Sequence, residues 1–257
     1  MIHTSSIIHP TAEIADDVSI GAFSIIGENV TIESGNIIGA HTVINGPTTI
    51  GPDNNILHFC SIGEDPQDKK YQGEADSILT IGRGNTIREY VSINRGTGDG
   101  GGKTIIGDEN WIMAYVHIAH DCIIGSHNIF ANNATLAGHV LIDDHAILGG
   151  FTGVHQFCHV GSYSFSAISS VIVKDVPPYV LVSGNTAKPS GLNREGLKRH
   201  GFSSETINML RKAYRLIYRD GLKLKDALSE LTSMSVESDE VKLLHDFISA
   251  SQRGIVR

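Results

Sequence analysis

The chain has 257 residues, a net charge of −8 at neutral pH and only 6% aromatic residues. This length suits one large domain, or one domain with a small appendage. The negative charge argues against a general nucleic-acid-binding protein, and no apolar run is long enough for stable membrane insertion.

The start of the chain shows no secretory signal, because Met1 leads directly into patterned sequence without a basic start or an apolar segment. Three cysteines do not make a disulfide framework, so we expect a cytoplasmic location. Lys and Arg are absent from Met1 to Asp68. An acidic macromolecular partner would therefore meet the middle or the C-terminal part of the chain.

An isoleucine recurs every sixth residue from the start of the chain. Eleven positions keep this register without a miss: Ile2, Ile8, Ile14, Ile20, Ile26, Ile32, Ile38, Ile44, Ile50, Ile56 and Ile62. The same period resumes at Ile81 and, with other apolar residues, from Ile106 to Ile172; Ser166 is an exception. Glycine often follows the marker, as at Gly21 and Gly39.

A period of six fits neither a helix, which repeats near 3.6, nor a half-buried strand, which repeats at two. It fits a parallel β-helix in which three short strands and three tight turns form one 18-residue coil. The marker is expected to point inward, and the glycine to relieve the corner. We therefore predict a hexapeptide-repeat solenoid over residues 1–186.

Two breaks in the repeat predict loops that leave the solenoid, at residues 65–77 and 96–103. The second reads GTGDGGGK and superficially resembles a phosphate loop. It fails that pattern because Thr97 occupies the position of the first glycine, and because a hexad follows where a helix is required. We interpret it as a flexible excursion that could lie over a binding cleft.

The period ends near Val173, and DVPP at 175–178 cannot continue a stack of strands. Apolar residues spaced by three and four then predict a helix that Ser203 or Ser204 caps and Gly221 ends. Further helices are predicted at residues 223–232 and 237–250. Residues 187–257 should therefore form a small α-helical C-terminal domain.

Four histidines are predicted to share one ridge of the solenoid. His120, His139 and His155 are separated by 19 and 16 residues, close to one coil each, and His117 precedes His120 on the same coil. Coils stack about 4.8 Å apart, so these rings can share one ligand. A solvent-exposed histidine ladder is the structural alternative, but Asp121, Asn132, Asn133 and Gln156 flank the group and favour a site.

Cys122 next to His120 could indicate a Cys–His nucleophile. However, Cys60, Cys122 and Cys158 each lie four residues after a marker, a phase expected to point inward. Buried structural thiols are therefore the favoured interpretation.

Zinc is a second alternative, since histidines are common zinc ligands. Side chains on stacked hexapeptides should project outward in parallel rather than converge, so we expect no metal. Base catalysis remains. Transfer of a group to a sugar hydroxyl needs a base that titrates near neutral pH, and His120 beside Asp121 provides one. Gly138 can present a bare backbone N–H to a developing oxyanion.

The chain closely resembles the acyl-[acyl-carrier-protein]–UDP-N-acetylglucosamine O-acyltransferase family, which catalyses the first step of lipid A synthesis. The resemblance runs essentially from end to end. It rests on these stretches: IHPTA (8–12), IGE and QDKKYQGE (within 62–74), IRE (87–89), RGT and GGG (within 95–102), HIAHDC (117–122), NNATLAGHV (132–140), VHQF (154–157), DVPPY (175–179) and EGLKRHGF (195–202).

The resemblance implies a left-handed β-helix assembled as a homotrimer, with active sites in clefts between subunits. It implies transfer of a 3-hydroxyacyl chain from acyl carrier protein to the glucosamine 3-hydroxyl of UDP-N-acetylglucosamine, without a cofactor or an acyl-enzyme. His120 would be the general base, Asp121 its partner and Gly138 the oxyanion donor. The remaining assignments fall into three groups. The sugar and acyl groups would contact Asp68, Lys70, His117 and His139. The nucleotide would contact Gln156, Asn193, Glu195 and Arg199, and His155, on the ridge of the other histidines, would also bind substrate. The carrier protein would dock at Arg88, Arg95 and Lys103.

Two positions depart from the family pattern. His200 stands where members often carry a second arginine, which would weaken a phosphate contact or make it pH-dependent. Ile168 stands where long-chain members carry glycine, so we expect a shorter acyl chain. Two other functions stay open from the sequence: an acetyl-CoA-dependent O-acetyltransferase, and a structural or zinc-binding solenoid.

Overall fold

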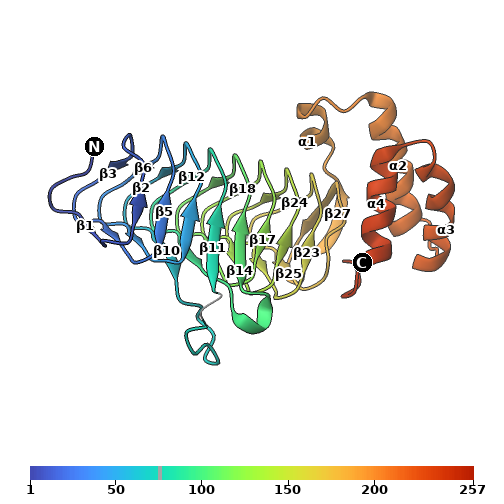
Figure 1. Cartoon of the computed structure of the whole chain (residues 1–257). Helices are drawn as coiled ribbons and strands as arrows, with labels where there is room; N and C mark the ends of the chain where they lie inside the picture. The colour runs from blue at the N-terminus through green and yellow to red at the C-terminus, as the bar shows by residue number, and fades with distance from the viewer. Residues whose placement is uncertain (75–76) are drawn as a thin grey trace.

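A computed structural model describes residues 1–74 and 77–257 of the chain. The chain winds into an elongated three-sided prism, with the N-terminus at one end and a group of helices at the other (Figure 1). Each turn of the winding adds one short strand to each of three sheets. The prediction of a left-handed parallel β-helix followed by helices is confirmed.

The three sides of the prism are a nine-, an eight- and a ten-stranded sheet. The nine-stranded sheet contains β1 (Ile7–Ile8), β4 (Ile25–Ile26), β7 (Val43–Ile44), β10 (Ser61–Glu64), β13 (Ser92–Asn94), β16 (His117–Ile118), β19 (Thr135–Leu136), β22 (Gly153–Val154) and β25 (Val171–Ile172). The eight-stranded sheet contains β2 (Glu13–Ile14), β5 (Val30–Ile32), β8 (Thr48–Ile50), β11 (Ile78–Ile81), β14 (Lys103–Ile106), β17 (Ile123–Ile124), β20 (Leu141–Ile142) and β23 (His159–Val160). The ten-stranded sheet contains β3 (Ser19–Ile20), β6 (Ile37–Ile38), β9 (Asn55–Ile56), β12 (Thr86–Ile87), β15 (Trp111–Ile112), β18 (Ile129–Phe130), β21 (Ile147–Leu148), β24 (Phe165–Ser166), β26 (Val180–Ser183) and β27 (Lys188–Leu192).

Three edges join these sheets, and each has its own set of side chains. The histidine edge, where the chain turns from the nine- to the eight-stranded sheet, carries Asp121, His139 and Phe157. The third edge, from the eight- to the ten-stranded sheet, carries His127, His145 and Tyr163. The aromatic edge, from the ten- to the nine-stranded sheet, carries Phe23, His41, Phe59, Tyr90 and Tyr115.

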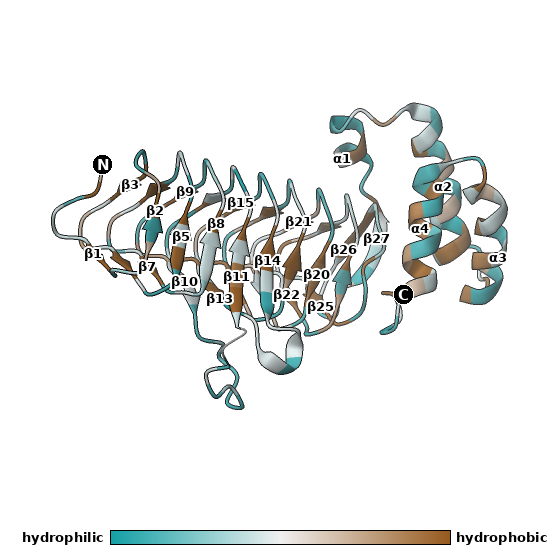
Figure 2. Ribbon diagram, in the orientation of Figure 1, coloured by the Kyte–Doolittle hydropathy of each residue, from teal (hydrophilic) through white to brown (hydrophobic). Residues whose placement is uncertain are grey.

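The hexad markers fill the interior of the prism, as predicted. Ile44, Ile50 and Ile56 have no exposed surface, and strands of neighbouring coils pair marker to marker. Figure 2 shows the apolar strands that line the prism. Ile2, at the open N-terminal end, is 44% exposed, because no earlier coil covers it.

The glycines that follow the markers have a different role from the predicted one. The residues with positive φ at the corners are mostly larger ones, such as His41 and Asp121. Gly21 and Gly39 have ordinary φ angles, but a Cβ at either would lie 2.5 Å from a backbone nitrogen of the next coil. These glycines therefore allow close stacking of coils rather than a left-handed turn.

A column of buried asparagines inside the third edge was not predicted. Asn36, Asn54, Asn85, Asn110 and Asn128 lie four residues after a marker, and each side-chain oxygen accepts from the backbone N–H of the next coil at 2.7–3.0 Å. The asparagines thus satisfy polar backbone groups at buried corners. The three cysteines occupy the same phase and are buried, as predicted.

Ser166, the exception to the period, and its neighbour Ser170 are also hydrogen-bonded inside the last coil. The Ser166 hydroxyl lies 2.9 Å from the Thr152 hydroxyl, and that of Ser170 donates to the Ala167 carbonyl at 2.7 Å. A small polar side chain therefore closes the interior where the repeat ends.

The second loop is more ordered than the predicted flexible excursion. It contains a 3-10 helix at Gly98–Gly100, which Thr97 caps, and backbone hydrogen bonds from Gly100 and Gly102 to the Thr97 carbonyl close it. Both loops leave the prism at the histidine edge (Figure 1). Part of the predicted first loop, residues 75–76, lies outside the described residues.

Four helices follow the prism: α1 (Arg194–Arg199), α2 (Ser204–Tyr218), α3 (Leu224–Ser235) and α4 (Asp239–Ala250). The Ser203 hydroxyl caps α2 by accepting from the Thr206 N–H, and α2 ends before the predicted Gly221. In the part of the chain that the structure describes, no helix has the length and apolarity needed to cross a membrane.

The helices share an apolar core with the last coils, in which Tyr179, Leu197, Leu210 and Leu244 are buried. The boundary predicted between the solenoid and the helical domain, after residue 186, stays a prediction. The strand β27 lies beyond that boundary but still pairs antiparallel with β26 of the prism.

Candidate functional site

The cluster HIAHDC places a histidine–aspartate pair at the histidine edge. Nδ1 of His120 lies 2.7 Å from Oδ2 of Asp121, and the Asp121 side chain is only 1% exposed. Because an ionised carboxylate only accepts hydrogen bonds, the imidazole donates from Nδ1 and its Nε2 is left as the basic nitrogen.

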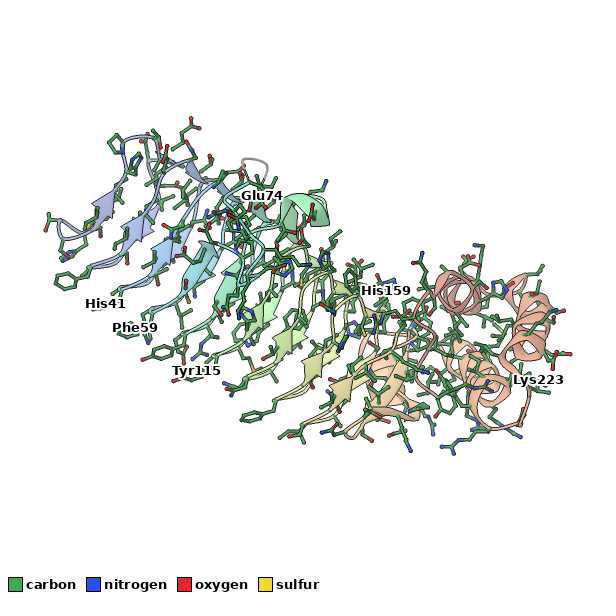
Figure 3. All side chains as sticks on the ribbon, turned by 90° about the horizontal axis from the view of Figure 1, so that it is seen from below. His41, Phe59, Glu74, Tyr115, His159 and Lys223 are labelled. Carbon is green, nitrogen blue, oxygen red and sulfur yellow. The ribbon has the colours of Figure 1, made fainter. Side chains whose placement is uncertain are left out.

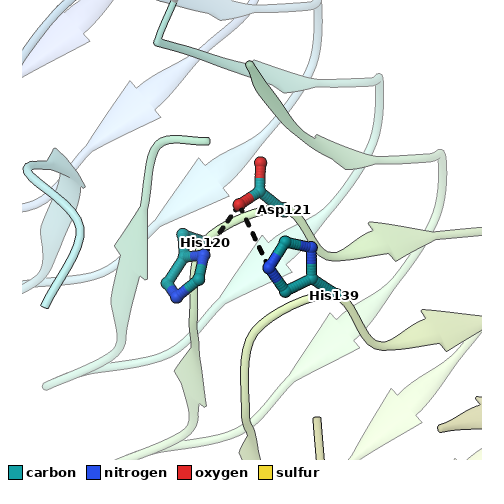
Figure 4. Close-up of side chains that lie close together, drawn as sticks. All are labelled: His120, Asp121 and His139. Atoms are coloured by element: carbon teal, nitrogen blue, oxygen red, sulfur yellow. Dashed lines mark hydrogen bonds and ion pairs between the residues drawn. The ribbon is translucent and has the colours of Figure 1, made fainter. Parts of the chain in front are cut away.

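His139 joins this pair from the next coil. Its ring meets that of His120 edge to face, with centroids 5.2 Å apart, and its Nε2 lies 3.7 Å from Oδ2 of Asp121 (Figure 4). The expectation that stacked side chains project outward in parallel is wrong at this position. Both histidines turn toward the carboxylate, and the three residues could geometrically hold a metal ion.

Asp121 has a further partner that the sequence did not indicate. The backbone N–H of Thr97 donates to Oδ1 at 2.9 Å, and the Thr97 hydroxyl donates to Oδ2 at 2.7 Å. Burial alone would raise the pKa of Asp121, but hydrogen bonds from His120 and Thr97 and the charge of His139 outweigh it and lower the pKa. Both oxygens are thus already committed, which favours a hydrogen-bonding role over metal ligation.

His117 lies behind this group on β16. Its Nδ1 lies 2.8 Å from the hydroxyl of Ser92 in the neighbouring strand. Burial lowers the pKa of His117, and the nearby His120 lowers it further. His117 is therefore neutral near pH 7 and can hydrogen-bond a substrate without adding charge.

Gly138 is required at its position by the close approach of His120. A Cβ on residue 138 would lie 2.6 Å from Cε1 of the imidazole. Within residues 1–74 and 77–257, no acceptor is found for the Gly138 backbone N–H, which leaves it able to donate to a substrate.

A pocket of about 520 Å³ opens over these groups. Its lining combines the histidine edge with both loops: Asp68, Lys70, Thr97, Asp99, Gly100, His120, His139, Gln156 and Phe157. Asp68, Lys70 and Gln156 were predicted from the sequence, and the structure places them beside His120. A second pocket of about 770 Å³ shares Gly100, His139 and Phe157 and extends toward α4. Two pockets therefore meet at His139.

His155 does not share this pocket. Its exposed imidazole turns toward the Gln156 carbonyl, with Nδ1 and the oxygen 3.2 Å apart, and toward Arg253. Of the four histidines predicted on one ridge, two, His120 and His139, are among the described residues that line the pocket. The residue that stacks on His139 is Phe157, at a centroid distance of 4.4 Å.

Three of the four predicted nucleotide residues lie away from this pocket, whereas the fourth, Gln156, lines it. Asn193 caps α1 and donates to the Tyr163 carbonyl at 2.9 Å, Glu195 pairs with Lys198, and Arg199 is exposed at the end of α1. In Figure 1, α1 and the two loops lie on opposite sides of the prism. One chain does not bring these residues to His120.

The predicted carrier-docking residues differ in accessibility. Lys103 is exposed, whereas Arg88 is engaged with Glu89 through two hydrogen bonds at 2.8 and 3.3 Å. Arg95 is only 7% exposed and binds Asp65 and the Gly63 carbonyl. Its burial contradicts a docking role, and Arg95 instead anchors the base of the first loop.

The thiols do not take part in the site. Burial raises the pKa of Cys122 to about 12 and that of Cys60 and Cys158 to about 11. A thiolate is the nucleophilic form, so Cys122 is not an activated nucleophile.

The chain is similar to known proteins along its whole length. Residues 175–256 match the family described as UDP N-acetylglucosamine O-acyltransferase, domain 2, and residues 11–46 and 103–138 match the bacterial transferase hexapeptide family. The acyl-[acyl-carrier-protein]–UDP-N-acetylglucosamine O-acyltransferase of Thiobacillus denitrificans is 57% identical over 256 residues, which cover 100% of this chain and 99% of the relative. This chain belongs to that O-acyltransferase family.

Solved O-acyltransferase structures superpose along the whole chain. The UDP-N-acetylglucosamine acyltransferase of Francisella novicida has a TM-score of 0.98 at 43% identity, covering 100% of this chain and 94% of that one. The O-acyltransferase of Moraxella catarrhalis has a TM-score of 0.97 at 47% identity and covers 100% and 99%. These relatives support the acyltransferase prediction over the acetyl-CoA-dependent and structural alternatives.

Proposed function

We propose that this protein transfers a 3-hydroxyacyl chain from acyl carrier protein to the 3-hydroxyl of the glucosamine in UDP-N-acetylglucosamine, the first step of lipid A synthesis. The observation that carries the proposal is His120, paired with the buried Asp121 carboxylate, in a pocket lined by Asp68 and Lys70, in a chain of this family. We expect the reaction to take place in the cytoplasm.

The geometry gives His120 the role of general base. Its Nε2 accepts the proton of the 3-hydroxyl as the sugar oxygen attacks the thioester carbonyl. Asp121 holds the ring by Nδ1 and stabilises the imidazolium that forms. The C–O bond forms, the C–S bond breaks, and the departing carrier thiol takes the proton back from His120.

Gly138 serves the carbonyl oxygen in this step. Negative charge develops on that oxygen in the tetrahedral intermediate, and a backbone N–H aimed at it is a fixed dipole that needs no reorganisation. Because the sugar attacks directly, no covalent acyl-enzyme forms, which agrees with inert, buried thiols.

The pocket supplies contacts of both charges to the sugar. We assign the pocket residues Asp68, Lys70 and His139, together with His117 of β16, to the sugar and the attached acyl group, and Gln156 to the nucleotide side. The two pockets that meet at His139 suit a reaction of two substrates, because donor and acceptor must reach the same base from different directions.

We infer that the active site is completed in a homotrimer. The aromatic edge presents a continuous stack of Phe23, His41, Phe59, Tyr90 and Tyr115, with centroids 4.9–5.2 Å apart. Figure 3 shows His41, Phe59 and Tyr115 along one edge of the prism. Phe23 and Tyr115 are 61% and 55% exposed in one chain, an apolar surface typical of an interface.

With the aromatic edge turned to a three-fold axis, the histidine edge of one subunit faces the third edge of the next. Asn193, Glu195 and Arg199, which one chain keeps away from His120, would then reach the nucleotide from the neighbouring subunit. This arrangement would bring the nucleotide residues of α1 to the pocket that already holds His120 and Gln156.

The test is mass spectrometry of products from purified protein, UDP-N-acetylglucosamine and a series of 3-hydroxyacyl carrier proteins, with acetyl-CoA in parallel. We expect one O-acylated product, from one range of carrier chain lengths, that disappears in His120→Ala. Product from acetyl-CoA alone, or none from any carrier, would overturn the proposal.

A further inference from the structure

Thr97 ties the second loop to the buried carboxylate of the site. It is 8% exposed, caps the 3-10 helix at Gly98–Gly100 and donates to both oxygens of Asp121, from its backbone at 2.9 Å and from its hydroxyl at 2.7 Å. Thr97 is therefore a bidentate hydrogen-bond donor to the Asp121 carboxylate.

This contact determines the orientation of the carboxylate. Oδ2 accepts from both Thr97 and His120, so rotation of the carboxylate would weaken both hydrogen bonds. The loop also packs against it: a Cβ on Gly100 would lie 2.2 Å from Oδ2. Asp121 has little freedom to turn away from the imidazole.

The same loop reaches the pocket, because Asp99 and Gly100 line it together with His120. Thr97 lines the pocket as well, and it also contacts the carboxylate that orients the base. None of these contacts follows the six-residue period, since the loop interrupts it.

We propose that Thr97 is a positioning residue for acyl transfer: it fixes the Asp121 carboxylate so that His120 holds the tautomer and orientation in which Nε2 faces the sugar hydroxyl. This inference rests on the proposed function. A threonine that only fastened the loop would affect stability, whereas a positioning threonine affects turnover after substrate is bound.

The variants Thr97→Val and Thr97→Ser separate these roles. Valine keeps the shape and the backbone N–H but loses the hydroxyl, and we expect kcat to fall about tenfold or more, as for loss of a hydrogen bond to a charged group. The KM for UDP-N-acetylglucosamine should change less than about twofold, because ground-state binding is retained. Serine restores the hydroxyl and should restore most of kcat.

Thr104→Val is the matched control. Thr104 is fully buried in β14, and its hydroxyl accepts from the backbone N–H of Asp121 at 2.9 Å, so it touches the same residue but not the carboxylate. We expect this variant to lower the melting temperature and to retain more turnover than Thr97→Val.

Three outcomes would overturn the inference: wild-type kcat in Thr97→Val, a loss in Thr97→Ser as large as in Thr97→Val, or an equal kcat loss in Thr104→Val. Failure of the proposed function is a separate result, since wild-type protein would then give no O-acylated product.

Discussion

At the residue scale, the chemistry of this protein depends on how burial changes the protonation of two neighbouring residues, Asp121 and Cys122. In HIAHDC, Asp121 is buried but has hydrogen-bond donors, so it stays charged. Cys122 stays protonated, because burial and the charge of Asp121 raise its pKa by more than two backbone hydrogen bonds lower it. The sequence places both beside His120, and only their environments separate a catalytic partner from a structural side chain.

We expect Cys122→Ala to keep nearly full activity, while His120→Ala loses about a hundredfold or more, the usual contribution of a general base. Steady-state rates with acyl carrier protein measure both. Thiol-directed alkylation of the folded wild type should leave the rate unchanged, and inactivation by modification of Cys122 would contradict the assignment.

Ile168 allows a residue-scale prediction about the donor. Its side chain is 70% exposed at the corner between the ten- and nine-stranded sheets, and a Cβ on Gly150 would lie 4.0 Å from its Cγ1. We expect Ile168→Gly to shift the preferred carrier toward longer acyl chains, because removal of the side chain lengthens the space available. Competition between carrier proteins that bear acyl chains of different length measures this preference. An unchanged preference would contradict a role of Ile168 in limiting chain length.

At the element scale, two-residue strands suffice because each coil pairs with the one before and the one after. The strand β17 shows how two residues divide between the interior and the surface. Ile124 is 1% exposed and faces the interior, whereas Ile123 is 44% exposed. Neither residue has a positive φ angle. Because successive side chains of a strand point to opposite faces, one isoleucine faces the interior and the other faces outward.

Substitution of these two isoleucines should therefore have unequal costs. We expect Ile124→Ala to lower the free energy of unfolding by about 2–5 kcal/mol, through lost burial and a cavity. Ile123→Ala should cost less than about 1 kcal/mol, since much of its side chain remains hydrated. Denaturant unfolding measures both, and equal losses would mean that the coil interior is not close-packed at Ile124.

The stacked rings of the third edge give a pH prediction. Burial lowers the pKa of His145, nearby His200 and His127 lower it further, and Asp144 raises it. The unfolded chain therefore binds a proton at a higher pH than the folded chain, so stability falls as the pH drops below the ordinary histidine value of ~6.5. His145→Phe keeps a ring against Tyr163 and removes this titration.

Thermal unfolding between roughly pH 7 and pH 5 tests the effect. The melting temperature of the wild type should fall more steeply than that of His145→Phe. Parallel curves would show that His145 titrates alike in the folded and unfolded chains.

At the scale of the whole molecule, one chain holds the base and three proposed nucleotide residues, Asn193, Glu195 and Arg199, on opposite sides of the prism (Figure 1). A shared site follows if subunits meet around the aromatic edge. Mixed trimers can test this directly, because each site would take His120 from one subunit and Arg199 from the next.

We expect His120→Ala and Arg199→Ala subunits, each impaired alone, to regain activity when they are unfolded and refolded together. The reason is that some interfaces then combine an intact His120 with an intact Arg199. Mixtures of His120→Ala with the double variant are the control and should stay inactive. If the mixture of His120→Ala and Arg199→Ala subunits forms trimers, as checked by mass measurement, but regains no activity, a site shared between subunits is contradicted.

The sequence by itself determined the architecture, because a period of six forces one inward side chain per strand and one strand per side of the coil. It also predicted that His120 and His139 lie on one edge, since residues about 18 apart stack, whereas His117 lies on the adjoining strand β16. Family resemblance added Asp68, Lys70 and Gln156, which the structure places in the pocket.

Tertiary structure alone decided the contacts that do not follow the period. Thr97 reaches Asp121 because a loop folds back over the edge, and Arg95 is buried for the same reason. His120 and His139, two and three residues after their markers, converge on Asp121, whereas His155, one residue after its marker, turns toward the Gln156 carbonyl. Periodicity specifies which coil and which face a residue occupies, whereas rotamers and loop paths depend on contacts between residues distant in the sequence.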